Sequence, residues 1–351
     1  MVGFNYSQFE NLHDSLTAYN NVEGRTVNLY TWQNQTAEPV LDGGKFMDYD
    51  GWQKQYGGYG AARLKPRDDL SVILGARVSS YRYRLTQIYP SNPAWDDVSR
   101  RNESGVVTPY AGIVYDLNPE HAVYASYTSI FKPQSVRDRN GATLDPRNGD
   151  NYEIGLKSAF FDGRLNSAIA LYEIRQDNLA ERDAGQTVPG TQNQAAYRAV
   201  SGAKTRGVDL EVNGEVLRHW QVGASYNFSS SEDATGTRIN TVFPRQMVKL
   251  WISYRLSGAF SGLTLGGGVN WQDRMYFTAT PWQLGKSITG EQKAYSVVNL
   301  MARYDFTKQL SATLNVNNVF DTKYLQGLDS TFYTGYYGPT RNAMLNLKYQ
   351  F

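Results

Sequence analysis

The feature of this sequence that most limits its possible folds is a strict two-residue alternation that continues to the last residue. From Gln309 to Asn317, and again from Asn342 to Phe351, apolar side chains alternate with polar ones. A period of two residues is typical of a β-strand with one apolar and one polar face. The second strand ends on an aromatic residue of its apolar face, as expected where the last strand of a closed barrel pairs with the first. We therefore predict that this tail is the closing hairpin of a membrane β-barrel.

The same alternation recurs along the chain and predicts an all-β, antiparallel protein. We expect about fourteen strands, in the segments 1–9, 53–64, 70–78, 106–116, 121–131, 151–160, 164–176, 208–216, 220–229, 244–256, 263–271, 294–306, 309–317 and 342–351. The longest polar segments between them are expected to be loops: 10–50, 85–104, 132–150 and 178–202. The connections alternate between a few residues and roughly 13 to 40 residues, as in outer-membrane barrels with short periplasmic turns and long outer loops.

Composition excludes several other classes of protein. The chain has 351 residues, a net charge of +2, no Cys and a mean hydropathy of −0.52. No stretch approaches the ~20 consecutive apolar residues of a transmembrane helix. The near-zero net charge gives no support for nucleic-acid binding, and the lack of Cys excludes disulfides and thiolate metal sites. The first nine residues do not read as a signal peptide, so we expect a barrel chain that is either mature or incomplete.

Charged residues in mid-strand indicate which face is polar. Each would cost up to about 2–4 kcal/mol in hydrocarbon, so we expect them to face a polar lumen. The alternative is the solvent face of an ordinary antiparallel sheet. The many Tyr near strand ends fit aromatic girdles at the two membrane interfaces. The charged residues concerned are Asp209, Glu211, Lys249, Arg303, Asp305 and Lys348.

Short motifs in a fixed order carry a family resemblance. The chain resembles the C-terminal barrel region of TonB-dependent siderophore receptors, most closely the ferric coprogen and rhodotorulic acid receptors, with the ferripyoverdine receptors nearby. The motifs span almost the whole chain: Thr108–Gly112 with Tyr115–Leu117, Tyr124–Gln134, Asn151–Lys157, Arg206–Glu211, Asn315–Asp321 with Tyr324, Tyr337–Asn342 and Tyr349–Phe351.

The resemblance implies a multi-pass outer-membrane transporter that binds a ferric siderophore, of hydroxamate type, and imports it with energy passed on by TonB–ExbB–ExbD. Such receptors have a barrel of roughly 22 strands around an N-terminal plug domain. Residues 1–351 match only barrel, so we expect the last fourteen strands of such a barrel without the plug. An even number of strands could also close as a smaller ring.

The resemblance and the loop positions together suggest ligand-binding residues. A ferric chelate needs aromatic walls with a few Arg, Tyr or Trp donors, and the iron arrives already chelated, so no cofactor is expected. For any single residue, packing in a loop or girdle is the more ordinary role. The aromatic candidates are Trp32, Trp52, Trp95, Tyr197, Tyr276, Trp282, Tyr333 and Tyr336, and the donors are Arg137, Arg139, Arg182 and Arg198.

The sequence offers little for catalysis or for a resident metal. Of its three His, His121 and His219 fall at short turns and His13 stands alone in a polar segment, so no general base is evident and we expect no enzyme. The acidic residues of the first long polar segment are expected to be solvated rather than metal ligands.

Three functional hypotheses stay open. A gated siderophore transporter predicts saturable, TonB-dependent uptake; a passive porin-like channel predicts conductance without an energy source; a non-functional remnant predicts no stable membrane product. The particular siderophore and any regulatory signalling role are not determined by the sequence.

Overall fold

The computed structural model describes residues 1–19, 40–191, 194–280, 285–329 and 334–351. Nearly all of this part is antiparallel β-sheet, as predicted, with two 3-10 turns, η1 (Pro93–Trp95) and η2 (Gly258–Phe260). Among the described residues no helix has the length and apolar character needed to cross a bilayer.

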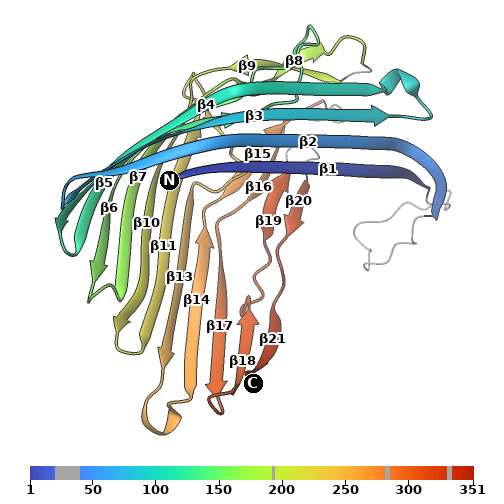
Figure 1. The fold of residues 1–351 in the computed structure, drawn as a ribbon. Coiled ribbons are helices and arrows are strands. Elements are labelled where there is room, and N and C mark those ends of the chain that lie inside the picture. The colour runs from blue at the N-terminus through green and yellow to red at the C-terminus, as the bar shows by residue number, and fades with distance from the viewer. Residues whose placement is uncertain (20–39, 192–193, 281–284, 330–333) are drawn as a thin grey trace.

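One large sheet forms the body of the molecule (Figure 1). It has fifteen strands, of which β12 (Arg238–Ile239) pairs only with β11, so fourteen lie on the main path. In spatial order the fourteen are β1 (Val2–Tyr19), β2 (Val40–Arg67), β3 (Leu70–Ile88), β4 (Asp97–Asn118), β5 (His121–Lys132), β6 (Arg147–Phe160), β7 (Leu165–Asp177), β10 (Ala203–Leu217), β11 (Trp220–Glu232), β13 (Gln246–Arg255), β14 (Leu263–Gln272), β17 (Tyr295–Asp305), β18 (Leu310–Asn317) and β21 (Asn342–Tyr349).

Three small hairpins stand in the long connections. They are β8 (Leu179–Thr187) with β9 (Ala195–Val200), β15 (Met275–Ala279) with β16 (Ile288–Gln292), and β19 (Leu325–Asp329) with β20 (Thr334–Tyr337). All three lie at the end of the sheet that carries the long connections, which we call the loop end. The opposite end, where short turns join the strands, is the turn end.

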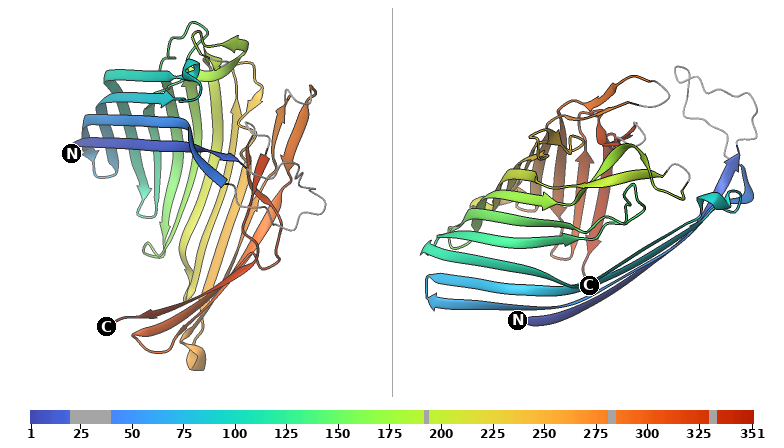
Figure 2. Two further views of the ribbon diagram at one scale, coloured as in Figure 1. Left: turned by 90° about the vertical axis from the view of Figure 1, so that its right-hand side faces the viewer. Right: turned by 90° about the horizontal axis from the view of Figure 1, so that it is seen from above.

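The sheet is open and strongly twisted. Figure 1 shows β1–β4 running across strands β14–β21, and Figure 2 shows the sheet as a curved wall with one chain terminus at each edge. In the described residues β1 pairs only with β2 and β21 only with β18. The fourteen strands on the main path therefore do not close as a smaller ring, which the sequence left open as an alternative. Both edges present unpaired backbone groups, which in a bilayer need a partner.

Strand register confirms the two-faced design. One continuous row runs across seven strands, from β3 to β11, and its members all lie on one face: Val72, Ile113, Ala125, Ile154, Leu171, Val208 and Phe228. Because directly paired residues project to the same face, this row marks an apolar outward face. Many of its large side chains are exposed, as a lipid-contacting surface requires.

The mid-strand charges lie on the opposite, inner face, as predicted. Glu211 pairs with Ser225, which pairs with Lys249, one residue out of phase with the apolar row. Arg303 likewise pairs with Thr313, between the outward Ala302 and Tyr304. The faces of β7 follow from the same register, because Leu171 pairs with both Ile154 and Val208 and is therefore outward.

Three predicted loops are wrong, because each contains strand. Much of the segment 10–50 is strand, since β1 continues to Tyr19 and β2 begins at Val40. Most of 85–104 also belongs to β3 or β4, and 178–202 contains the hairpin β8–β9. These segments extend beyond the apolar row, where both faces meet water. Alternation is not required there, and the backbone pairing of the strands continues without an apolar face.

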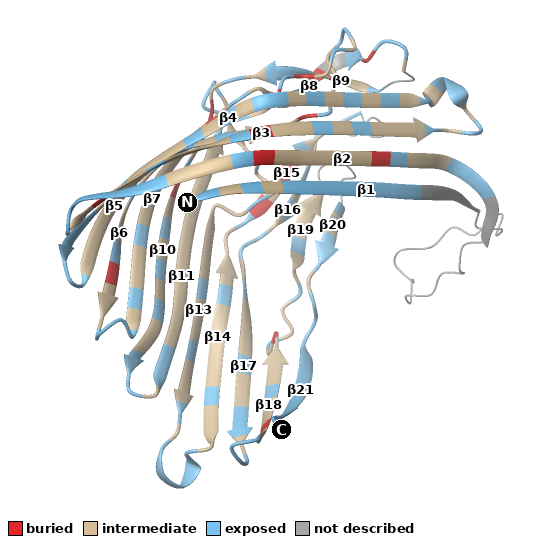
Figure 3. Ribbon diagram, viewed as in Figure 1, coloured by how far each residue is buried: buried red, intermediate tan, exposed pale blue. Residues whose placement is uncertain are grey.

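The molecule has little conventional core, because the main sheet is one layer thick (Figure 3). The buried apolar side chains of the described residues are Leu144, Val188, Ala196, Ala203, Met275 and Phe277. Most of them belong to the segments added at the loop end rather than to the wall. The loop end is therefore where tertiary packing, as opposed to strand pairing, is concentrated.

Candidate ligand-binding face

The inner face of the wall is lined by tyrosines that cover glycines of the neighbouring strand. A Cβ added to Gly75 would lie 2.2 Å from the ring of Tyr110, and one added to Gly207 would lie 2.2 Å from the ring of Tyr172. No larger residue fits beneath these rings. The same arrangement occurs at Tyr59 over Gly3 and Tyr124 over Gly155. These tyrosines are part of the inner wall, so the girdle interpretation does not apply to them.

A cleft of about 440 Å³ opens on the inner face near the loop end of β13–β21. Its polar lining comes from Lys249, Asn270, Gln272, Asn299, Asn317, Gln326 and Asn342. The rings of Tyr295 and Tyr324 stack beside it, with centroids 4.4 Å apart and planes 25° apart. Carboxamides and tyrosines can both donate and accept hydrogen bonds, so this cleft suits a polar, oxygen-rich ligand.

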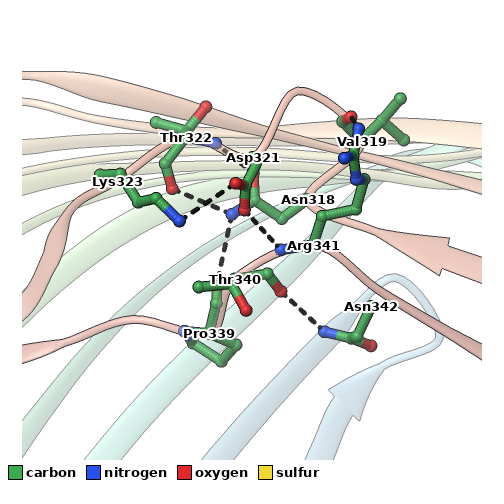
Figure 4. Close-up of polar contacts among 9 residues, drawn as sticks. All are labelled: Asn318, Val319, Asp321, Thr322, Lys323, Pro339, Thr340, Arg341 and Asn342. Atoms are coloured by element: carbon green, nitrogen blue, oxygen red, sulfur yellow. Dashed lines mark hydrogen bonds and ion pairs between the residues drawn. The ribbon is translucent and has the colours of Figure 1, made fainter. Parts of the chain in front are cut away.

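Asn318 fixes the connection between β18 and β21 beside this cleft (Figure 4). Its side chain is only 2% exposed, and Nδ2 donates to the carbonyl oxygens of Thr322 and Pro339, both at 3.0 Å. Its Oδ1 accepts from the backbone N–H of Thr322 at 2.8 Å. Asn318 has φ of 50°, a left-handed conformation that Asn tolerates better than most residues. We call the contacts of Asn318 and Asp321 the β18–β21 clamp.

Asp321 supplies the second half of the clamp. Its Oδ1 accepts from the backbone N–H of Arg341 at 2.9 Å, and its Oδ2 accepts from the Lys323 ammonium at 3.0 Å. The backbone N–H of Arg341, and then Lys323, hold the pKa of this carboxyl below its ordinary value of 3.8. The two closing sequence motifs, at 315–321 and 337–342, are thus brought together by hydrogen bonds.

A basic cluster lies at the loop end, where the segment 133–146 meets hairpin β8–β9. The Arg137 guanidinium is 2.7 Å from Asp97, and Arg137 O accepts from the backbone N–H of Tyr197 at 2.8 Å. Arg139 Nε donates to Asp183 at 2.8 Å. Arg198 pairs with Glu181 at 3.2 Å on the adjacent rung of the hairpin. The structure therefore brings together four predicted site residues, Arg137, Arg139, Tyr197 and Arg198, with each guanidinium already paired to a carboxylate.

The other predicted aromatic residues lie elsewhere. Tyr276, on β15, has the guanidinium carbons of Arg238 and Arg274 at 5.5 and 5.3 Å from its ring centroid. Tyr336, on β20, is largely exposed. Trp95 contacts Tyr89 edge-on, at 5.5 Å between ring centroids, near the tip of the β3–β4 connection.

Trp52 differs from the rest, because its strand phase places it on the outward face. It pairs with Arg84, which belongs to the same phase of β3 as Leu74 and Val78. The remaining candidates, Trp32, Trp282 and Tyr333, lie outside the described residues. Arg182 lies on β8, where it pairs with Tyr197.

A larger hollow of about 900 Å³ lies at the turn end of β3–β10. Its lining includes Asp116, Lys157 and Glu211 on the inner face and His121 at a short turn. His121 Nδ1 lies 2.8 Å from Ser158 Oγ, and no ion pair joins His121 to a carboxylate among the described residues. Across the described part of the chain no group of three His, Asp or Glu side chains is placed to hold a metal ion.

Comparison with known proteins decides the family. A family model described as "TonB dependent receptor-like, beta-barrel" matches residues 2–319. The chain belongs to the TonB-dependent receptor family. Barrels of this family are outer-membrane proteins, so the outward apolar face of this one contacts outer-membrane lipid, and its turn end and loop end are the periplasmic and extracellular ends.

Individual relatives within the TonB-dependent receptors are similar over nearly the whole chain. The "Ferric-pyoverdine 358 receptor" of Pseudomonas putida is 45% identical over 100% of this chain and 41% of its own length. The structure of the ferripyoverdine receptor of Pseudomonas aeruginosa bound to ferripyoverdine has 36% identity and a TM-score of 0.82, over 99% of this chain and 45% of that one. The alcaligin receptor of Bordetella pertussis has 41% identity and a TM-score of 0.67, over 87% and 46%.

These relatives refine the resemblance seen in the sequence. The chain spans less than half the length of the receptors it matches. Their names are those of ferric-pyoverdine and alcaligin receptors, so the coprogen subtype expected from the motifs is not confirmed. The relatives are transport receptors, consistent with the expectation that the chain is not an enzyme.

Sequence reasoning did not select the inner-face cleft as a site. Asn270 and Asn299 lie on the polar faces of their strands, toward the extracellular ends. The alternation pattern alone therefore could have identified these two residues as lining the inner face. Tyr324 and Asn342 were recognised only as motif residues. Their meeting depends on the β18–β21 clamp, which has no sequence periodicity.

Proposed function

We propose that these residues form the wall and part of the outer binding face of a receptor that imports a ferric siderophore of the pyoverdine class, driven by TonB. The observation that carries the proposal is the match of 99% of this chain to a receptor solved with ferripyoverdine bound. The similarity includes the extracellular hairpins as well as the wall, so it extends to the part that meets a ligand arriving from outside.

The chemistry of the extracellular end supports this proposal. Stacked tyrosines, carboxamides and an array of arginines offer aromatic area with directional donors, which suits a chelate that presents polar oxygen atoms. Iron inside a chelate needs no protein ligands of its own. The ligand-contacting candidates are the sequence-predicted Trp32, Trp95, Tyr197, Tyr276, Trp282, Tyr333, Tyr336, Arg137, Arg139 and Arg198, joined by Asn270, Asn299, Tyr295 and Tyr324.

The inner face is proposed to receive a plug domain of the kind that the family resemblance implies, through which TonB–ExbB–ExbD would act. The polar inner wall and its 900 Å³ periplasmic hollow offer Lys157, Glu211 and Asp116 for contacts with such a domain. Direct and water-mediated hydrogen bonds to such a domain would replace those that this polar surface makes to water.

Uptake of radiolabelled iron tests the proposal. A strain that makes this receptor as its single siderophore receptor is given ⁵⁵Fe-pyoverdine, ⁵⁵Fe-coprogen or ⁵⁵Fe-alcaligin, with and without TonB. We expect saturable uptake of the pyoverdine complex that disappears without TonB. Uptake of coprogen iron alone would replace the pyoverdine class by the hydroxamate class, and no uptake of any complex would overturn the proposal.

A passive channel is the second candidate, favoured by the polar inner face with its mid-strand charges. Planar-bilayer recording on the protein from outer membranes distinguishes the two. A steady conductance at low voltage, together with TonB-independent entry of iron, would support the channel. A closed baseline with TonB-dependent uptake supports the transporter.

A further inference from the structure

The outward face of β2–β4 changes character just above the apolar band. On β3 the outward residues Leu70, Val72, Leu74, Ala76 and Val78 form an apolar run of nine residues from the periplasmic turn. A transmembrane β-strand needs about 9–11 residues to cross the hydrocarbon. The next outward residue of β3 is Ser80, and Arg82 and Arg84 follow it, so these two arginines lie at the level of the outer-leaflet headgroups.

Four cationic side chains occupy adjacent rungs at this level. Lys54 pairs with Arg82, and Arg84 pairs with Arg100, in the same outward phase. The two rungs are neighbours, so the four groups form one patch, which we call the outward basic patch. Trp52, on the rung of Arg84, has the Lys54 ammonium 5.3 Å from its ring centroid. The patch borders a cleft of about 570 Å³ lined by Trp52, Arg82, Arg84, Arg100 and Asn102 among others.

The protein leaves this charge unneutralised. In the described part of the chain no ion pair involves Lys54, Arg82, Arg84 or Arg100. The nearest outward acids by register are Glu10, diagonal to Lys54, and Asp50, diagonal to Arg84. Glu10 Oε1 accepts a hydrogen bond from Gln8, and among the described residues neither carboxylate forms an ion pair with the four cations. Four clustered cations without counter-ions repel one another, so their placement on one face needs an anion from outside the chain.

A matched region of the same wall lacks this feature. On β7 and β10, Arg175 and Arg206 lie in the outward phase just above the outward Leu171 and Val208. Both are paired with Glu173, each with Nε 2.7 Å from a carboxylate oxygen. At the same height the wall therefore has one cluster whose arginines are paired with a carboxylate and one cluster whose cations are not.

We propose that the outward basic patch binds the phosphate groups of an anionic lipid headgroup in the outer leaflet of the outer membrane. Arginine presents a planar fork that matches phosphate oxygens bidentately, and three of the four cations are Arg. Trp52 has the position and chemistry of an interfacial aromatic residue, with its ring against acyl chains and headgroups. The patch faces away from the lumen, so a ligand in transit through the barrel does not meet it.

Native mass spectrometry on the detergent-solubilised receptor provides the test. The probe is a hexa-acylated glucosamine-disaccharide lipid that carries two phosphates, compared with the same lipid after removal of both phosphates. The test variant is R82Q/R84Q/R100Q and the matched control is E173Q/R175Q/R206Q. Each basic residue near an anionic leaflet contributes about 5-fold in affinity, so we expect roughly 100-fold weaker binding by the test variant. The control should stay within about 3-fold of the unmodified protein.

Two further arms separate the possible outcomes. The dephosphorylated lipid should bind the unmodified receptor as weakly as the phosphorylated lipid binds the test variant. This arm uses only the unmodified protein, so it does not depend on whether a variant folds. R82K/R84K/R100K should recover most of the affinity, because it restores charge without the fork. Equal binding of both lipids, or equal loss in the control variant, would overturn the proposal. Displacement of the lipid by inorganic phosphate at equal concentration would reassign the patch to free phosphate and overturn it as a lipid site.

Discussion

The part of the wall at bilayer height and the part above it are held together by different physical means. At bilayer height each strand alternates, the outward row from Val72 to Phe228 is apolar, and the buried apolar side chains of the described residues lie mostly elsewhere, at the loop end. Above the bilayer both faces are polar, and specific contacts such as the Arg137–Asp97 ion pair and the β18–β21 clamp fix the chain. Lipid thus imposes a pattern on the first part, whereas the second depends on individual partners.

The largest difference between the two parts of the wall is expected when a charged residue is introduced on the outward face of each. Ile169 is outward on β7, midway between the periplasmic turn and Glu173, and pairs with Leu156 and Leu210. Ile169→Arg should destabilise the folded barrel by about 2–4 kcal/mol because the guanidinium enters hydrocarbon. Reversible unfolding in lipid bilayers, followed by tryptophan fluorescence against denaturant, measures the change.

Val98→Arg is the matched control, because Val98 is also outward and exposed but belongs to the polar extension of β4. We expect a change within about 0.5 kcal/mol there. Equal costs at the two positions would mean that the apolar band does not end where the register places it.

The second test removes the buried amide of the clamp. Asn318→Ala leaves the carbonyls of Thr322 and Pro339 and the N–H of Thr322 without their partner. We expect a loss of about 2–3 kcal/mol in local stability, with the wall unaffected. Proteolysis of the 318–342 connection under native conditions, beside the heat-modifiable migration of the whole barrel, reports the two parts separately.

Asn318→Asp separates the contribution of the amide oxygen from that of the amide N–H groups. It keeps an oxygen for the N–H of Thr322 but loses both donors, so its effect should approach that of Ala. If Asn318→Ala also abolished heat-modifiable migration, the clamp would belong to the wall rather than to the extracellular part.

The different origins of the two parts explain what the sequence could predict. Alternation located β18 and β21 nearly to the residue, because lipid on one side and polar contents on the other leave no alternative pattern. The extension of β1 beyond residue 9 was missed because neither face of that stretch is apolar. The bulge near Gly105, with φ of 67° and a register shift between Ser79 and Tyr81, also interrupts the phase of β4 where a loop was expected.

The residue types of the candidate site could be predicted from the sequence, but their ion-pair partners could not. Loop position was enough to select Arg137, Arg139 and Arg198, but their carboxylates come from Asp97, Asp183 and Glu181 on other segments. No periodicity encodes such meetings. The outward position of Trp52 could have been found by counting in steps of two from Leu64, since both belong to one strand and one phase.

The third test compares two extracellular ion pairs of different burial. The side chains of Arg137 and Asp97 are 16% and 14% exposed, whereas those of Arg198 and Glu181 are more than half exposed. Asp97→Asn should cost about 2 kcal/mol, because a largely buried guanidinium loses its counter-charge. Glu181→Gln should cost about 0.5 kcal/mol or less, because water screens that pair.

Hydrogen exchange of the Tyr197 amide reports both changes, since Arg137 O accepts its N–H and Tyr197 lies beside Arg198 on β9. Reversal of the two magnitudes would show that the hairpin β8–β9, rather than the link from β4 to residue 137, carries the stability of the cluster.

The smallest expected effect is a pH dependence confined to the clamp. The pKa of Asp321 is held below 3.8 by the N–H of Arg341 and then by Lys323, so the folded clamp favours the carboxylate. A lowered pKa adds stability that is fully present above 3.8 and is lost as the pH falls through the folded-state value. Protection of the Arg341 amide from exchange, corrected for intrinsic rates, should be constant from neutral pH to mildly acidic pH and fall below 3.8. Asp321→Asn keeps an accepting oxygen but does not titrate, so its protection should lack this step. A step of equal size in both proteins would locate the acid sensitivity in the wall and remove the distinction between the two parts.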